Sequence, residues 1–331
     1  SPMALSGLKS GDPLAPTVRQ WWKDKAAEIY AAIPDFGGFL VKANSEGQAG
    51  PQDYGRTHAD GANMLAEAVA PYGGIIMWRA FVYSPTSNDR ANQAVEEFKS
   101  LDGQFADNVI IQIKNGPIDF QPREPFSPLF GQLYNTPMMM EFQITQEYLG
   151  FSNHLVYHGT TYEECLDSDT YRDGKGSTVA KMVKAIAGVA NTGQDHNFCG
   201  YIFAQSNWYA FGRLAWDPTL SAGQIADEWV RQTFIRPKGM TPQAYARKFL
   251  IPVKDIMMSS RETAVNYMMP LGFHHIFGGS HYGPGPWESS IRPDWSPIFY
   301  HKAGKDGVGF DRTRNGSANV DQYHEPLASQ F

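Results

Sequence analysis

The strongest constraint on the fold is a regular alternation of short apolar segments with amphipathic ones between about residues 12 and 210. The apolar segments are nearly continuous runs, as expected of parallel strands that are buried on both faces. They predict strands at Gly38–Lys42, Gly74–Phe81, Asn108–Lys114, Met138–Thr145 and Gly200–Gln205. The amphipathic segments predict helices at Thr17–Ala32, Gly61–Ala70, Asp89–Leu101, Gly176–Ala190 and Ala222–Phe234. This alternation is typical of an α/β protein with a parallel sheet.

The length of the repeating unit favours a barrel. The charged residues that end successive strands, Lys42, Arg79, Lys114 and Glu147, are 37, 35 and 33 residues apart. A strand–helix unit of about 35 residues fits a (β/α)8 TIM barrel of about 250 residues. A doubly wound sheet has similar units, but no Gly-x-Gly-x-x-Gly follows a strand, and "DGKGST" lacks the Walker spacing. We therefore predict a (β/α)8 barrel.

The character of the sequence changes after residue 235. Thr241–Met269 predicts a helix that is interrupted at Pro252, and a segment rich in Gly, Pro, His and aromatic residues follows it. Such a segment is typical of a long functional loop or a small appended region. We predict a barrel catalytic portion at residues 1–234 and the start of a helical, loop-rich C-terminal domain at residues 235–331.

Composition excludes several classes of partner. The net charge of -6 argues against a nucleic-acid ligand, which requires a basic face. No apolar run approaches the roughly 20 residues of a membrane span, and the first residues lack the pattern of a signal peptide. Cys165 and Cys199 have neither metal-ligand spacing nor a disulfide framework, so we interpret them as structural thiols.

Each central strand ends in ionisable side chains, where a barrel places its active site. Lys42, Asn44 and Glu46 alternate after the first strand and therefore share a face. Arg79 ends the second strand, and Lys114, followed by Asp119, ends the third. Glu147 ends the fourth, on one face with Glu141, Gln143 and Thr145. One such residue could be a solvated rim charge, but four consecutive strands ending this way indicate groups that serve each other or a ligand.

The residue types point to the hydrolysis of an acidic sugar. Three carboxylates, Glu46, Asp119 and Glu147, fit glycoside hydrolysis, in which one acid protonates the leaving oxygen and another activates water or attacks. The three cations Lys42, Arg79 and Lys114 exceed what a neutral sugar requires and would suit the carboxylate of a uronic acid. No His, Asp or Glu cluster has metal-ligand spacing, so the residues predict no metal site.

Three alternatives remain at this point. A barrel glycosidase acting on a neutral sugar, perhaps with retention, would leave the three cations without a ligand. A non-catalytic carbohydrate-binding protein could use Trp208, Trp287 and Trp295 as stacking platforms, but would leave the carboxylates unexplained. A purely structural fragment is the third alternative.

At these residues the sequence resembles the α-glucuronidases of glycoside hydrolase family 67. The resemblance rests on long blocks, among them "KANSEGQAGPQDYGRTHADGAN", "MWRAFVYSP", "QIKNGPIDFQPREP", "EFQITQEYLG" and "GQDHNFCGYIFAQSNWYAFGRLAWDP". It implies removal of α-1,2-linked glucuronic acid, or its 4-O-methyl ether, from xylo-oligosaccharides derived from glucuronoxylan, with inversion and without a cofactor.

The resemblance also implies a role for each site residue. Glu46 matches the general acid, and Asp119 and Glu147 match the carboxylates that handle the attacking water. The cations Lys42, Arg79 and Lys114 match positions that hold the uronate. Trp295, in "RPDWSP", aligns with an aromatic that closes the sugar pocket.

The chain is shorter than members of this family. It resembles an internal segment with barrel strands four to eight and part of the C-terminal domain, so we expect an incomplete barrel with two exposed edges. The resemblance implies a homodimer through the C-terminal region. We expect a cytoplasmic or cell-associated location rather than secretion, on a chain whose native N-terminus is missing.

Overall fold

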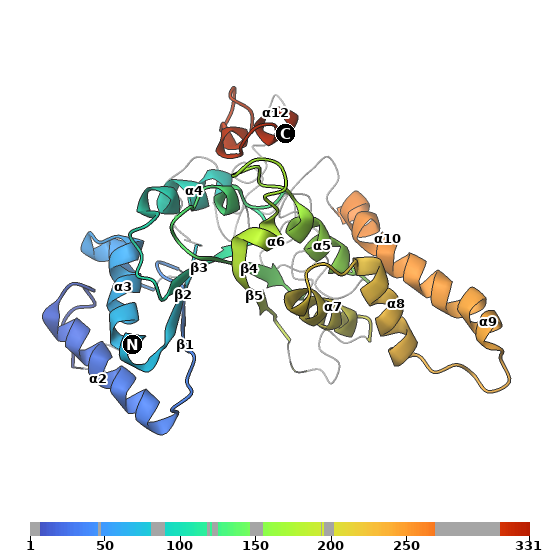
Figure 1. The fold of residues 1–331 in the computed structure, drawn as a ribbon, viewed down its shortest axis with the longest axis horizontal. Helices are drawn as coiled ribbons and strands as arrows, with labels where there is room; N and C mark the ends of the chain where they lie inside the picture. The colour runs from blue at the N-terminus through green and yellow to red at the C-terminus, as the bar shows by residue number, and fades with distance from the viewer. Residues whose placement is uncertain are drawn as a thin grey trace, which may run out of the picture.

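The centre of the fold is a row of five parallel strands. The computed structural model describes residues 7–45, 48–80, 90–117, 120, 125–145, 155–192, 194, 202–268 and 312–331. The strands are β1 (Gly38–Val41), β2 (Ile75–Arg79), β3 (Val109–Lys114), β4 (Met138–Gln143) and β5 (Val183–Val189). They lie side by side in chain order, each parallel to the next, and form a curved sheet (Figure 1).

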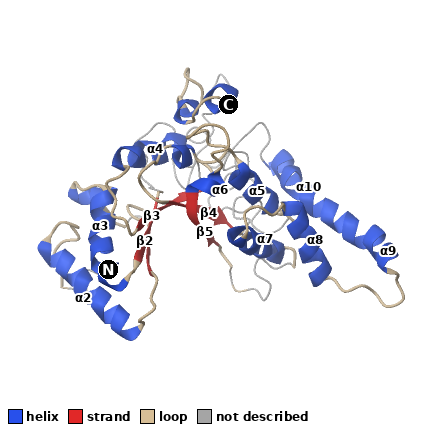
Figure 2. Ribbon diagram, viewed as in Figure 1, coloured by secondary structure: helices blue, strands red, loops and turns tan. Residues whose placement is uncertain are grey.

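Helices precede the first strand, lie in the connections between the strands and follow the last strand, and several of them line the outer side of the curve (Figure 1). Those of the first part are α2 (Pro16–Ala32), α3 (His58–Val69), α4 (Gln93–Phe98), α5 (Gly159–Asp167) and α6 (Val179–Met182). Those of the second part are α7 (Ala204–Trp216), α8 (Ala222–Thr233), α9 (Pro242–Tyr245), α10 (Ile251–Met268) and α12 (Leu327–Gln330). Figure 2 shows the strands enclosed on this side by α3, α4, α5 and α7. None of the helices in the described ranges is long and apolar enough to cross a membrane.

The two faces of the sheet differ in chemistry. Successive side chains of a strand point to opposite faces. The residues that face the helices are apolar and nearly fully buried: Ile76, Trp78, Ile111, Ile113, Met140 and Phe142. The alternate positions near the strand ends are polar or charged: Arg79, Gln112, Lys114, Glu141 and Gln143. In a barrel, this second face would line the interior.

The prediction of a parallel α/β sheet is confirmed. Five consecutive parallel strands with helices along one side fit an incomplete α/β barrel, as the sequence predicted. Closure into eight strands is not seen among the described residues, where β1 and β5 form the edges of the sheet.

The predicted helix at Gly176–Ala190 is wrong over most of its length. Only Val179–Met182 is helical, and Val183–Val189 forms β5. The alanines of this segment suggested a helix, but six backbone positions pair with β4, and Val183 and Ile186 pack, partly buried, against the core. Tertiary pairing therefore overrides the local helix preference.

The predicted strand at Gly200–Gln205 is also wrong where the structure describes it. Ala204 and Gln205 begin α7. This helix buries Ala210 and Leu214 on one side, a spacing of four residues that suits a helix.

The C-terminal region is helical up to Met268, in line with the sequence. The predicted interruption near Pro252 takes the form of a π-helical turn at Ala246–Leu250, directly before α10. Pro252 has no N–H to donate to the preceding turn, so a change of hydrogen-bond register at this point is expected.

The last described segment, residues 312–331, lies beside α4, far from it in the chain (Figure 1). The Asn319 side chain donates to Ala91 O and Asn92 Oδ1, and Tyr323 Oη donates to Phe126 O at 2.7 Å. The contacts attach this segment to the connection between β2 and β3 through Ala91 and Asn92, and to the connection between β3 and β4 through Phe126.

Candidate active site

The carboxyl ends of β1, β2 and β3 bring the three predicted cations to one edge of the sheet. Arg79 is the last residue of β2 and Lys114 is the last residue of β3. Lys42 follows β1 by one residue and is half-buried. Because the three strands are neighbours and parallel, their ends meet at the same edge. That edge is where α/β barrels place their catalytic groups.

Arg79 forms a bidentate ion pair with Glu141 of β4. Arg79 Nε donates to Glu141 Oε2 at 2.7 Å, and an Arg79 terminal nitrogen donates to Glu141 Oε1 at 2.5 Å. The side chain of Glu141 is 0% exposed and that of Arg79 is 13% exposed. Paired hydrogen bonds of this geometry fix the plane of the guanidinium as well as its distance.

Gln112 of β3 lies between these two charged residues in the sheet. It is the register partner of Arg79, and its Nε2 donates to Glu141 Oε2. The side chain is buried, and its Oε1 has no hydrogen-bond partner among the described residues. Among the described residues, the side chain of Gln112 therefore acts as a hydrogen-bond donor, to Glu141.

Lys114 is buried beside the same cluster. It is the register partner of Glu141 and is 7% exposed. Its Nζ lies 4.5 Å from the centre of the Phe120 ring, within the range of a cation–π contact. Phe120 holds this place with a left-handed backbone, φ 51°. A lysine this deeply buried is consistent with a ligand-facing role as well as a structural one.

In the loop after β1, hydrogen bonds join described residues that precede and follow Glu46 in the chain. Asn44 adopts a left-handed conformation, φ 49°, and its Nδ2 donates to Asp53 Oδ2 at 3.0 Å. Gly50 N donates to the same oxygen at 2.8 Å, and a side chain at Gly50 would collide with Asn44 Oδ1. Asp53 therefore joins the two sides of this loop, with Asn44 as its partner on the side of β1.

The other predicted site residues lie outside the described residues. They are Glu46, Asp119, Glu147 and Trp295, together with the candidate stacking residue Trp287. Trp208, the third stacking candidate, lies on α7 and is 40% exposed. The structure thus brings together the predicted cations, while the roles of the three carboxylates stay predictions.

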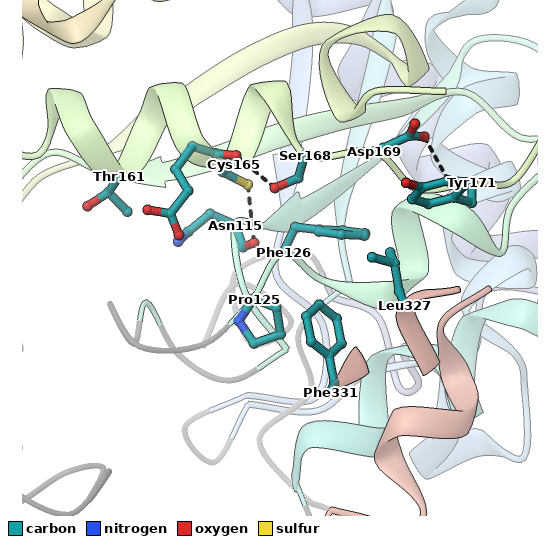
Figure 3. Close-up of a pocket in the computed structure, with 11 residues that line it drawn as sticks. Asn115, Pro125, Phe126, Thr161, Cys165, Ser168, Asp169, Tyr171, Leu327 and Phe331 are labelled. Atoms are coloured by element: carbon teal, nitrogen blue, oxygen red, sulfur yellow. Dashed lines mark hydrogen bonds between the residues drawn. The ribbon is translucent and has the colours of Figure 1, made fainter. Parts of the chain in front are cut away.

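A cavity of about 350 Å³ lies on the helix side of the sheet, between α5 and the C-terminal segment (Figure 3). Asn115, Phe126 and Cys165 line it, and Leu327 and Phe331 close it. None of Lys42, Arg79 and Lys114 contributes to its lining. Burial raises the pKa of the Cys165 thiol, which donates to Asn115 O, so this cysteine is a packed side chain rather than a nucleophile.

Sequence comparison identifies the class of protein. Residues 1–198 match the family model "Glycosyl hydrolase family 67 middle domain", and residues 199–331 match "Glycosyl hydrolase family 67 C-terminus". The chain belongs to glycosyl hydrolase family 67, as its sequence motifs predicted. The two family models meet between residues 198 and 199, whereas the predicted boundary between the barrel portion and the C-terminal domain lies between residues 234 and 235. This domain boundary stays a prediction.

Its relatives include fungal enzymes. The chain is 44% identical to "Probable alpha-glucuronidase A" of Aspergillus flavus and 43% identical to "Alpha-glucuronidase A" of Emericella nidulans, over 349 and 351 aligned positions. It is 42% identical to "Probable alpha-glucuronidase A" of Aspergillus niger. Each alignment covers the whole chain but 40% of the relative, so the chain spans about two fifths of the length of these proteins.

Sequence reasoning missed the pairing of Arg79 with Glu141 and Gln112. It placed Glu141 on the same face as Glu147 but gave it no role. The signal was present in the alternation of the strands, because Gln112 shares a face with Lys114, and Glu141 shares one with Gln143. The strand register, which the sequence does not give, was needed to join them.

Proposed function

We propose that the protein containing this chain is an α-glucuronidase that removes α-1,2-linked glucuronic acid, or its 4-O-methyl ether, from xylo-oligosaccharides. The observation that carries the proposal is the convergence of Lys42, Arg79 and Lys114 at one edge of a sheet in a chain of glycosyl hydrolase family 67. A uronate carboxylate can accept charge-assisted hydrogen bonds from these side chains, which a neutral sugar cannot. The names of the relatives support the same substrate class.

The proposed binding step places the sugar carboxylate against the cations. Arg79 has a fixed guanidinium plane because Glu141 holds two of its nitrogens. Lys114 is largely removed from water, so its attraction to an anion is screened less than that of a surface lysine. Lys42 approaches from the neighbouring strand end. Together these groups would bind and orient the sugar for reaction.

The proposed chemical step uses Glu46 as general acid and Asp119 and Glu147 as the pair that activates water. Glu46 protonates the glycosidic oxygen as the bond to the sugar breaks, and one of the other two carboxylates removes a proton from the attacking water. Attack from the opposite face inverts the anomeric carbon. An inverting reaction requires about 6.5–9.5 Å between acid and base, with room for that water.

The experiment is the hydrolysis of an aldobiouronic-type oligosaccharide, followed by proton NMR within the first turnovers. We expect free glucuronic acid, with the β-anomer appearing first because an α-linkage is inverted. Early appearance of the α-anomer would establish retention, and binding without release would favour a non-catalytic carbohydrate-binding protein.

A variant tests the acid role. General acid catalysis contributes about 10²–10⁴-fold, so Glu46→Gln should reduce turnover by about that factor. The reduction should be smaller for a substrate with a good leaving group, which does not need the proton. Equal reductions for both substrates would remove Glu46 from this role.

A further inference from the structure

We propose that Glu141 and Gln112 are positioning residues for recognition of the sugar carboxylate, acting through Arg79. The inference rests on the proposed function, because it assigns two further side chains to the same site. Glu141 makes its contacts with Arg79 and Gln112 on the sheet face opposite the helices.

Burying Glu141 costs free energy. A carboxylate with no exposed surface loses its hydration, and it is stable only when charged or polar partners replace the lost water. Arg79 supplies two hydrogen bonds and Gln112 supplies a third. A well-packed apolar pair at these positions would serve stability at least as well, so stability alone does not account for this arrangement.

The contacts of Glu141 and Gln112 fix the orientation of the Arg79 guanidinium. A guanidinium held through Nε and one terminal nitrogen can no longer rotate about its last side-chain bonds. Gln112 in turn holds Oε2, the oxygen that accepts from Arg79 Nε. The plane of Arg79 is thus set by two residues from two other strands, before any ligand arrives.

Glu141 also changes the charge of the site. The pair of Arg79 and Glu141 is neutral as a unit, so Arg79 contributes directed hydrogen bonding rather than net positive charge. Loss of Glu141 would add positive charge but would release the orientation of Arg79, and we infer that orientation dominates.

The test is the KM for an aldobiouronic-type substrate and the Kd of D-glucuronic acid, measured for the wild type and for Glu141→Gln. The glutamine cannot accept from both Arg79 nitrogens and presents an amide donor to one of them. We expect KM and Kd to rise about 10–100-fold, the contribution of a hydrogen bond to a charged group. We expect a smaller change in kcat. Neither KM nor Kd depends on the folded fraction, so a merely structural role would leave both unchanged.

Two further variants make the test decisive. Gln112→Met keeps the ion pair and removes one hydrogen bond to it, and should raise KM about threefold. Glu228→Gln is the matched control, because Glu228 accepts from Arg213 Nε at 2.9 Å and from a terminal nitrogen at 3.2 Å, between α7 and α8. Its KM should equal that of the wild type.

The outcomes separate the inference from the proposed function. If the wild type releases glucuronic acid and Glu141→Gln has an unchanged or lower KM, the inference fails alone. If Glu141→Gln does not fold, an unchanged KM in Gln112→Met overturns it. A wild type that neither binds nor releases glucuronic acid overturns both.

Discussion

The two faces of the β2–β3–β4 sheet are built from the same strands but are stabilised in different ways. Toward the helices, Trp78, Ile111 and Phe142 are at most 2% exposed and pack against apolar neighbours. Toward the other side, Arg79, Gln112 and Glu141 are held by directed hydrogen bonds. Apolar packing tolerates small shifts, whereas paired hydrogen bonds specify an orientation. We therefore expect substitutions on the first face to change stability, and those on the second face to change recognition.

The largest effect on stability should come from Phe142→Ala. Phe142 is 1% exposed and lies 4.5 Å from the Tyr162 ring, centre to centre. The cavity left behind should lower the free energy of unfolding by about 3–5 kcal/mol. Urea denaturation measures this loss, and the KM of the folded protein should not change. A loss below about 1 kcal/mol, or a changed KM, would break the distinction between the faces.

Acid should destabilise the helix side through His158. Burial, with a smaller effect of the Arg261 charge, lowers the pKa of His158 from 6.5 to about 4. Because the folded-state pKa is the lower one, the stabilisation by neutral His158 is fully present above about pH 6.5 and is lost as the pH falls toward 4. A difference of this size corresponds to about 3 kcal/mol.

The matched variant for this prediction is His158→Phe, which keeps a ring against Tyr162. Its stability, measured by thermal unfolding from pH 7 to 4, should fall less steeply than that of the wild type. Identical slopes would show that other groups cause the acid sensitivity.

Lys114→Met should show the opposite pattern to Phe142→Ala. The substitution keeps most of the side-chain volume and removes a charge at the predicted uronate site. Hydrogen bonds to charged groups contribute about 1.5–3 kcal/mol, so KM for the uronide should rise about 10–100-fold. The urea midpoint should change far less than in Phe142→Ala. A large loss of stability with an unchanged KM would place Lys114 among the structural residues.

The smallest effect should come from the C-terminal segment. Tyr323→Phe removes the donor to Phe126 O, and Tyr157→Phe removes an equivalent buried donor to Ala222 O at 3.0 Å in the helix layer. Each should lower the free energy of unfolding by about 1–2 kcal/mol. If only Tyr157→Phe does so, the segment at residues 312–331 contributes no stability to the connection after β3.

The difference between the apolar and the polar face of the sheet also explains which features the sequence predicts well. The apolar runs of β1 to β4 were located correctly because both faces of a parallel strand are shielded and the pattern is strong. The segment that forms β5 was assigned to a helix, because its alanines carry little strand preference and only pairing with β4 decides its structure. The cations at the strand ends were found from their regular spacing. The ion pair of Arg79 with Glu141 was not, because it spans two strands and depends on register.

The central claim is that the polar face recognises a sugar carboxylate. Its most direct test compares kcat/KM for an aldobiouronic-type oligosaccharide with that for the same oligosaccharide reduced to the neutral glucoside. We expect efficient release of the sugar from the acid and at least about a hundredfold lower kcat/KM for the glucoside, as the loss of charge-assisted hydrogen bonds to Arg79 and the lysines implies. Comparable values for the two substrates would contradict the claim.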